Sequence, residues 1–232
     1  MPFSEETLTR LKADAAEITG RYPRARSALL PLLYLVQAEE GYVSDEGMAF
    51  CAEVLGITQT EVRGVATFYT MYKHEPAAEY QVGVCTNTTC AIMGGDQIYA
   101  ELAEHLGGDP HGDGHHDIKS PDGKVAVERL ECNAACDYAP VVMVNWEFFD
   151  NQTPESARKL VDSLREGQPA PPTRGAPLCV FRETSRILAG LPDERPDQGQ
   201  GGAGAATLAG LKLAKEHGMQ APPAPNASGE EQ

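Results

Sequence analysis

Apolar side chains recur at helical intervals over roughly the first 75 residues of the chain. The pattern starts after Ser4, a residue that can cap a helix by accepting a backbone N–H bond. Leu8, Leu11, Ala15 and Ile18 then fall on one helical face. This spacing predicts an amphipathic helix at the start of the chain.

The next apolar stretch predicts a second helix over residues 24–39. Pro31 lies in its first turns, where proline is tolerated, and Gly41 follows its end as a usual stop signal. The apolar surface of this helix is wider than the stripe of about 100° that packing on a single core requires. The helical segment could serve only to stabilise the domain, but this wide surface favours docking of its exposed face on a partner protein.

Two further helices complete a predicted N-terminal helical bundle over residues 1–78. Ser44 starts the first, and Thr58 with Glu61 forms a capping box for the second. The second also carries apolar side chains at i, i+3, i+4 and i+7, namely Val62, Val65, Ala66 and Tyr69.

Beyond Glu79 the apolar period changes to that of strands. Strands are predicted at residues 80–85 and 125–132 with a helix between them, followed by a hairpin (VVMVN and WEFFD) and a helix from Thr153. A strand–helix–strand unit followed by a hairpin and a helix is a thioredoxin-like outline. Residues 79–168 are therefore predicted to form a second domain, which makes the chain α+β.

The last segment, residues 169–232, differs in composition. Nine prolines and nine glycines occur among its 64 residues, close to the share of roughly 25–30% that is typical of low-complexity sequence. Two stretches within it, residues 178–191 and 206–218, have apolar side chains at helical spacing. We expect a tail without its own core that docks on a partner.

Length and charge exclude several classes of function. A chain of 232 residues can bury one sizeable core with appendages. Its formal net charge of −15 opposes binding to nucleic acid or anionic lipid. The N-terminus lacks the apolar region of a secretory signal, and the longest apolar run, residues 28–36, is shorter than the roughly 20 residues of a membrane span. Neither export nor membrane insertion is predicted.

Four of the six cysteines form two pairs at the ends of predicted strands: Cys85 with Cys90 in CTNTTC, and Cys132 with Cys136 in CNAAC. A strand–helix–strand crossover makes the two strands parallel, so both end at the same edge of one sheet. Four thiolates can converge there. In a reducing compartment, paired cysteines indicate metal ligands or redox groups more than disulfides.

The residues around these cysteines suit a 2Fe-2S cluster, which is anionic and needs backbone N–H donors at close range. Small or polar residues fill both loops and follow the first pair: Thr86, Asn87, Thr88, Thr89, Ala91, Gly94, Gly95, Asn133, Ala134 and Ala135. Neither loop contains lysine or arginine, and Asp137 is adjacent. A low reduction potential is therefore predicted.

Other uses of these cysteines are less compatible with the spacing. Structural zinc commonly uses C-x2-C knuckles, whereas these pairs are C-x4-C and C-x3-C. A thioredoxin-type dithiol requires C-x-x-C. Cys51 and Cys179 are not at ligand spacing and are expected to be a buried thiol and an interface residue.

Two further sets of residues carry no predicted function of their own. His111, His115 and His116 occur in a glycine-rich acidic loop, which is typical of a solvated insertion. The glycine-rich nucleotide signatures are missing, so neither NADH nor flavin is expected to bind this chain.

The sequence resembles a known family over about residues 8–166. CTNTTC, ECNAACDYAPVVMVN, ALLPLLYLVQ and VRGVATFYTMY are similar to segments of the thioredoxin-like 2Fe-2S subunit of respiratory complex I, the bacterial NADH:quinone oxidoreductase. The resemblance implies that Cys85, Cys90, Cys132 and Cys136 bind one 2Fe-2S cluster and that the chain has no catalytic residue of its own.

The same resemblance implies a place in a larger assembly. A partner subunit would bind FMN and NADH, and this chain would exchange one electron with the flavin, next to other hydrophilic-arm subunits of a proton-translocating NADH dehydrogenase. The complex would hold the chain at the cytoplasmic face of the cell membrane. The histidine-containing loop and the tail beyond Pro169 lie outside the shared pattern.

Three alternatives remain open at this point. Similar subunits serve as diaphorase components of NAD-linked hydrogenases and formate dehydrogenases. A stand-alone thioredoxin-like ferredoxin would not need the N-terminal bundle or the tail. A structural zinc adaptor would be colourless and would give no spin resonance signal after reduction.

Overall fold

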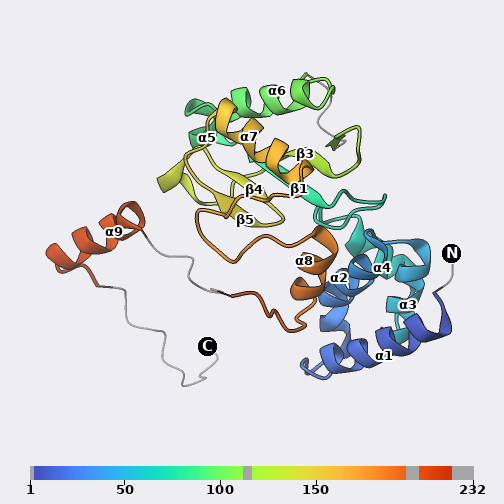
Figure 1. Ribbon diagram of the computed structural model, residues 1–232. Coiled ribbons are helices and arrows are strands. Elements are labelled where there is room, and N and C mark those ends of the chain that lie inside the picture. The colour runs from blue at the N-terminus through green and yellow to red at the C-terminus, as the bar shows by residue number, and fades with distance from the viewer. Residues whose placement is uncertain (1–2, 112–116, 197–203, 221–232) are drawn as a thin grey trace.

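The computed structural model describes residues 3–111, 117–196 and 204–220. Figure 1 shows a group of helices on one side of the molecule and a sheet with its covering helices on the other. Each part has its own buried apolar core. Within the described ranges, no helix is long and apolar enough to cross a membrane.

The helical part contains the predicted N-terminal helices. They are α1 (Glu5–Thr19), α2 (Leu29–Glu40), α3 (Asp45–Leu55) and α4 (Gln59–Ala66), with a short 3-10 turn, η1 (Ala25–Ala28), before α2. The Ser4 side chain accepts a hydrogen bond from the Thr7 N–H, as expected of a cap. Gly41 ends α2 with a φ of 83°, in the left-handed region that favours glycine.

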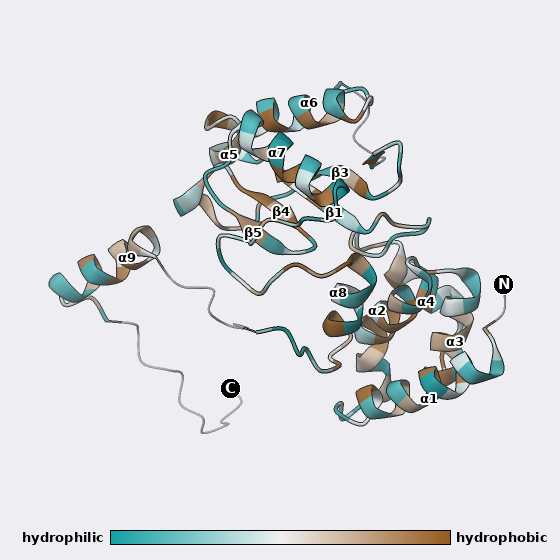
Figure 2. Cartoon of the chain, viewed as in Figure 1, coloured by the Kyte–Doolittle hydropathy of each residue, from teal (hydrophilic) through white to brown (hydrophobic). Residues whose placement is uncertain are grey.

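The broad apolar surface of α2 is covered by the same chain. Helix α8 (Phe181–Leu188), from the segment expected to be a tail, packs directly on α2 (Figure 1). Ala189 and Leu191 are buried against the helical part, and Figure 2 shows hydrophobic stretches of α2 beside α8. The structure therefore differs from the expectation of a foreign partner for residues 178–191, because the two unpaired apolar surfaces bury each other.

A buried glutamine fixes how α8 sits on α2. The Gln37 amide nitrogen donates to the Ser185 hydroxyl of α8 (3.3 Å) and to the Met71 carbonyl (3.2 Å). Its amide oxygen accepts the backbone N–H of Lys73 at 2.8 Å. Because a buried amide is costly unless it is hydrogen-bonded, these contacts select one register for α8.

The sheet has the strand order β2-β3-β1-β4-β5. Its strands are β1 (Tyr80–Cys85), β2 (Ile118–Lys119), β3 (Val125–Leu130), β4 (Val142–Val144) and β5 (Glu147–Phe149). Strands β1 and β3 pair in parallel, and β4 and β5 form the predicted hairpin. The short edge strand β2 is not predicted by the pattern, because two residues carry no periodicity.

Three helices accompany the sheet: α5 (Thr88–Ile92), α6 (Gly95–His105) and α7 (Pro154–Arg165). Helices α6 and α7 lie side by side on the sheet (Figure 1) and bury Ile98, Leu102, Val161 and Leu164 against it. The remaining helix, α9 (Ala205–Glu216), buries no side chain. Figure 1 shows it standing away from the rest of the molecule.

A half-buried ion cluster joins the helical part to the sheet. The Lys73 ammonium lies 2.9 Å from a carboxylate oxygen of Glu128 on β3 and 3.0 Å from one of Asp117. Burial opposes the charge of Lys73, but the two carboxylates together raise its pKa. Burial also raises the pKa of Glu128, and Asp117 adds to this effect, because two acids share one base.

The capping box of α4 gives a pH-dependent prediction. The Glu61 carboxylate accepts the Thr58 N–H, the Thr58 hydroxyl and a bond from Arg26, which together lower the pKa of Glu61 from 4.5 to about 2. A carboxyl group with a lowered folded pKa contributes stability above its unfolded pKa and loses it as the pH falls through the folded value. Thermal unfolding should therefore show Glu61→Gln less stable than the parent at neutral pH, with the gap closing towards pH 2.

The matched control for this prediction is Glu53→Gln on α3, where the carboxylate is exposed and its nearest cation, Lys12, is 3.6 Å away. That variant should remain close to the parent throughout. An equal loss for Glu61→Gln at neutral and acid pH would show that charge is not what the cap requires.

Candidate metal centre

The two cysteine pairs meet at the carboxyl edge of the two central strands. Cys85 is the last residue of β1 and Cys90 lies in α5, and both are buried. Cys132 and Cys136 occupy the segment after β3 and are exposed. In the parallel ladder Cys85 stands opposite Leu130, so Cys132 follows two residues beyond it. Both pairs therefore lie at the same edge of the sheet, as the crossover predicts.

The first pair lies together in a small buried cluster. Ala135, Ala139 and Val141 pack around Cys85 and Cys90, with Phe148 against them. Cys132 lies on the exposed side, where its sulfur accepts the backbone N–H of Ala134 at 3.3 Å.

Burial sets the protonation of the Cys90 thiol. It raises the pKa of Cys90 to about 11, and the neighbouring Cys85 thiol adds to the shift. Without a metal the thiol of Cys90 is therefore the neutral form at physiological pH. A bound metal ion ionises a coordinating thiol outright, so this neutral form does not prevent ligation.

The backbone comes unusually close to the first pair at Gly95. A Cβ added there would lie 2.4 Å from the Cys85 carbonyl oxygen and 2.9 Å from that of Cys90, so only glycine fits. Gly95 is also the first residue of α6. The positive end of that helix dipole thus lies beside the cysteine pair and favours an anionic group there.

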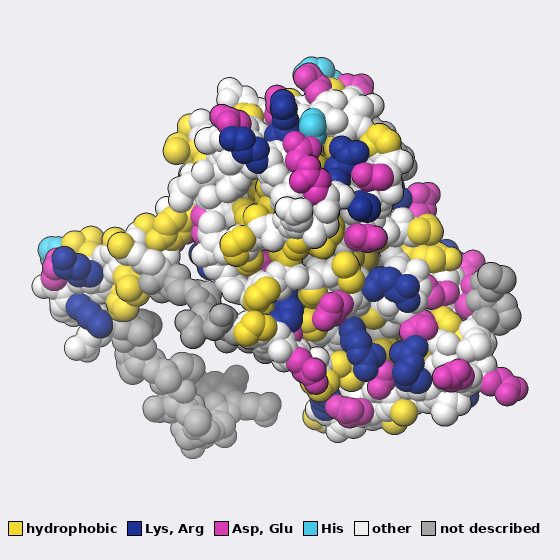
Figure 3. Space-filling model, in the orientation of Figure 1, with side chains coloured by type: hydrophobic (Ala, Val, Ile, Leu, Met, Phe, Trp, Pro, Cys, Tyr) yellow, Lys and Arg dark blue, Asp and Glu magenta, His cyan; other side chains and the backbone are white. Residues whose placement is uncertain are grey.

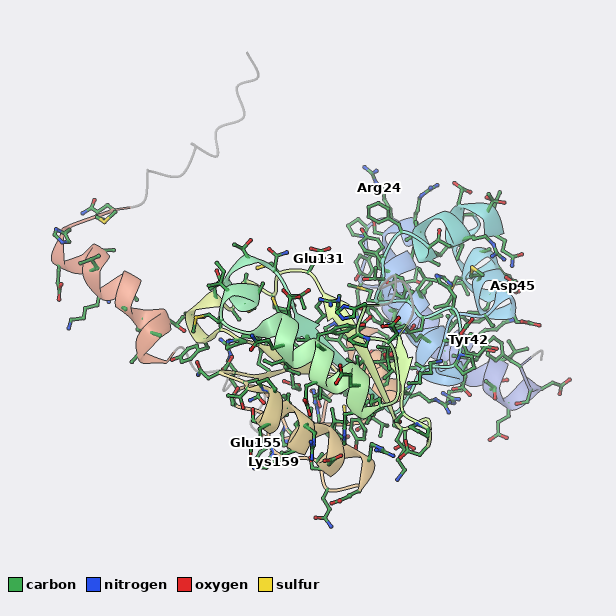
Figure 4. The ribbon with its side chains drawn as sticks, turned by 90° about the horizontal axis from the view of Figure 1, so that it is seen from above. Arg24, Tyr42, Asp45, Glu131, Glu155 and Lys159 are labelled. Carbon is green, nitrogen blue, oxygen red and sulfur yellow. The ribbon has the colours of Figure 1, made fainter. Side chains whose placement is uncertain are left out.

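Hydrogen bonds also connect the two loops and shape the second. The Asn87 amide donates to the Glu131 carboxylate at 3.3 Å, linking the segment after β1 to the segment after β3. Glu131 stands on the outer side of the sheet in Figure 4. Ala134 adopts left-handed backbone with a φ of 53°. The peptide bond between Ala139 and Pro140 is cis.

The chemistry of the donor set fits an iron-sulfur cluster, because four cysteine thiols lie at one edge of the sheet and thiolates are the usual ligands of such clusters. Across residues 3–111, 117–196 and 204–220, no group of three or more histidine, cysteine or acidic side chains is close enough to share one metal ion. The amide nitrogen of Asn133, inside the second loop, is buried without a hydrogen-bond partner.

The other candidates from the sequence lie elsewhere. Cys51 is buried in α3, and burial raises its pKa to about 12. Cys179 is buried, with its sulfur 3.2 Å from the Thr184 hydroxyl. His111 is described, and its backbone N–H donates to Asp109. His115 and His116 lie outside the described residues.

Two contacts at the second loop could not be found from the sequence. The Arg174 guanidinium lies 4.5 Å from the Phe148 ring centre and 5.5 Å from that of Tyr138, and it pairs with Asp150 at 2.8 Å. The Thr207 hydroxyl, at the start of α9, donates to the Asp137 carboxylate. Both come from segments distant in the chain, and Figure 4 shows α9 extending away from the sheet.

Comparison with known proteins gives a consistent result. The profile of the thioredoxin-like 2Fe-2S ferredoxin family matches residues 15–165. The E subunit of NADH-quinone oxidoreductase from Mycobacterium tuberculosis is 64% identical over 225 residues, which is 97% of this chain and 87% of that protein. NADH-quinone oxidoreductase subunit 2 of Thermus thermophilus is 37% identical over 161 residues, covering 68% and 86%.

Among solved structures, a crystal structure of an NAD+-reducing NiFe-hydrogenase is similar, with a TM-score of 0.50 and 17% sequence identity. The match covers 60% of this chain and 23% of the hydrogenase chain. At this identity the similarity concerns the fold alone.

Proposed function

Since the chain belongs to the thioredoxin-like 2Fe-2S ferredoxin family, we propose that it is the electron-transfer 2Fe-2S subunit of an NADH-quinone oxidoreductase. Cys85, Cys90, Cys132 and Cys136 would hold one 2Fe-2S cluster. The meeting of a buried and an exposed cysteine pair at one sheet edge is the observation that carries this proposal. The 64% identity over nearly the whole chain favours the quinone-linked enzyme over a hydrogenase diaphorase.

When bound, the cluster supplies one-electron redox chemistry. The residues of this chain determine how it is held and from which side it is reached. Val141 and Phe148 shield the Cys85 and Cys90 side from water. The Ala134 N–H and the start of α6 offer positive groups to the anionic sulfurs. Cys132 and Cys136 lie on the accessible side, which is therefore the face through which electrons would arrive.

The FMN and the NADH site would be on a partner subunit that covers this face. Exposed apolar side chains lie next to Cys90, since Ile92 is 81% and Met93 58% exposed. Such large apolar groups are typical of a surface that becomes buried on association. The chain would thus bring its cluster against the flavin-bearing subunit.

Helix α9 would extend this interface. Leu208, Leu211, Leu213 and Met219 are exposed on or just after it, and Figure 3 shows hydrophobic side chains over α9. The helix begins at the cluster loop, where Thr207 bonds Asp137 and a side chain at Gly204 would clash with the Tyr138 hydroxyl. A partner that covers Cys132 and Cys136 would therefore also reach α9.

The test is reconstitution of the full chain with the flavin-binding subunit from the same organism. The anaerobically purified chain should be brown, should contain iron and acid-labile sulfide in equal amounts, and should give a spin resonance signal after reduction. It should bind the flavin subunit, and NADH should then reduce the cluster. Colourless protein containing zinc instead would overturn the proposal.

The contribution of α9 is measured in the same assay. Leu208→Ser combined with Leu211→Ser should weaken binding to the flavin subunit about tenfold or more, because burial of two leucines is lost. The matched control is Val180→Ser, which alters an apolar side chain of similar exposure in another part of the molecule. If both variants bind the flavin subunit with equal affinity, α9 is not part of the interface.

A further inference from the structure

The side-chain amide nitrogen of Asn133 is buried without a hydrogen-bond partner. Among the described residues, three buried side-chain nitrogen or oxygen atoms lack a hydrogen-bond partner: Thr19 Oγ1, Asn133 Nδ2 and Arg174 Nε. The Arg174 guanidinium lies against the Phe148 and Tyr138 rings, whose electron-rich faces attract cations. Asn133 has no such explanation within the described residues, and it lies between the second pair of cysteines.

A buried amide donor without an acceptor is destabilising, and native proteins rarely retain one. The next two residues, Ala134 and Ala135, are apolar, so the loop does not by itself require a polar side chain at position 133. The backbone N–H of Ala134 already donates to the Cys132 sulfur. Sulfur is thus an acceptor that this loop uses.

We propose that the Asn133 amide nitrogen donates a hydrogen bond to a sulfur of the bound 2Fe-2S cluster, and that this bond raises the reduction potential. The inference rests on the proposed function and adds a residue to it. Reduction adds an electron to an anionic cluster, so a donor to sulfur stabilises the reduced state more than the oxidised state. Asn133 would be a positioning and tuning residue that complements the four ligands.

The test compares midpoint potentials in the intact chain, by redox titration followed with spin resonance. Asn133→Leu keeps a similar side-chain shape and removes both amide protons, so its midpoint should shift to more negative potential. Asn133→Asp replaces the donor by a carboxylate and should shift it further in the same direction. Iron content should stay at the parent level, which separates tuning from loss of a ligand.

The matched control is Gln59→Leu on α4, in the helical part of the molecule. It also removes a side-chain amide donor, since the Gln59 amide nitrogen donates to the Asp45 carbonyl at 2.9 Å. Its midpoint should equal that of the parent. A fully loaded Asn133→Leu variant with the parent midpoint would overturn the inference and leave the proposed function intact.

A second measurement covers the case in which Asn133→Leu does not load a cluster. In the parent chain labelled with 15N-asparagine, pulsed spin resonance of the reduced cluster should show coupling to one side-chain nitrogen, and this coupling should be missing in Asn133→Asp. No coupling in a loaded parent chain also overturns the inference. A parent chain that binds no iron and no sulfide would instead refute the proposed function itself.

Discussion

The Cys90→Ala variant is expected to lose the 2Fe-2S cluster, with iron and acid-labile sulfide falling to near background and the reduced-state spin resonance signal disappearing. Cys90 is buried in the same apolar cluster as Cys85. Alanine removes a thiolate from the enclosed side of the site, where the neighbouring side chains are apolar and offer no substitute ligand. Elemental analysis and spectroscopy of the purified variant measure the effect.

Cys51→Ala and Cys179→Ala are the matched controls, because each removes a buried thiol from another part of the molecule. Both should retain iron at the parent level. Cys132→Ser should give an altered or lost signal, since a serine oxygen at the exposed position is a poorer ligand for iron. Full iron content in Cys90→Ala, or loss of iron in Cys51→Ala, would contradict the assignment of the ligands.

The second large effect is expected at the junction of the helical part and the sheet. The Lys73→Met variant should lose about 3–5 kcal/mol of unfolding free energy, because it leaves the carboxylates of Asp117 and Glu128 without their shared cation. The Lys73 side chain is only 12% exposed, so solvent cannot replace it well. Urea denaturation of the apoprotein, which avoids a contribution from the cluster, is the measurement.

Two comparisons make this prediction specific. Lys12→Met removes a lysine from an exposed pair with Glu53 and should cost less than about 1 kcal/mol. Glu128→Gln in the Lys73→Met background should recover part of the loss, because it removes one uncompensated charge. If Lys12→Met and Lys73→Met lower the unfolding free energy equally, the ion cluster around Lys73 does not stabilise the junction.

The loss of unfolding free energy in Lys73→Met should depend on pH in a defined direction. The pKa of Glu128 is raised by burial, so its protonated form favours the folded state, and that contribution is lost as the pH rises through the folded pKa. Removal of Lys73 raises this pKa further. The variant should therefore be closest to the parent in acid and furthest from it at neutral pH.

Much of the site could be predicted because its determinants are local or topological. Cys85 ends a strand whose residues are all buried, and the strand–helix–strand crossover makes β1 and β3 parallel. Those two facts are sufficient to place both cysteine pairs at one edge. In the sequence Asn133 is only a small polar loop residue, since nothing along the chain shows that its amide is buried.

The sequence could not predict which distant segments of the chain pack against each other. The apolar surfaces of α2 and of residues 178–191 are both evident in the sequence, and each is expected from it to meet another protein. The structure pairs them, with Gln37 and Ser185 in contact across 148 positions of sequence. The cation near the second loop, Arg174, escapes prediction for the same reason, because it lies 38 positions beyond Cys136.

The amino-acid order alone therefore determined the helices, the central strands and the edge at which four cysteines gather. Helix period, capping and crossover handedness act over a few residues or one connection, so they can be read along the chain. Only the tertiary structure decided that α8 covers α2, that Lys73 is shared by two half-buried acids and that the Asn133 amide nitrogen is enclosed. Apolar burial is non-directional, and an apolar surface does not specify its partner until shape and buried polar groups select one.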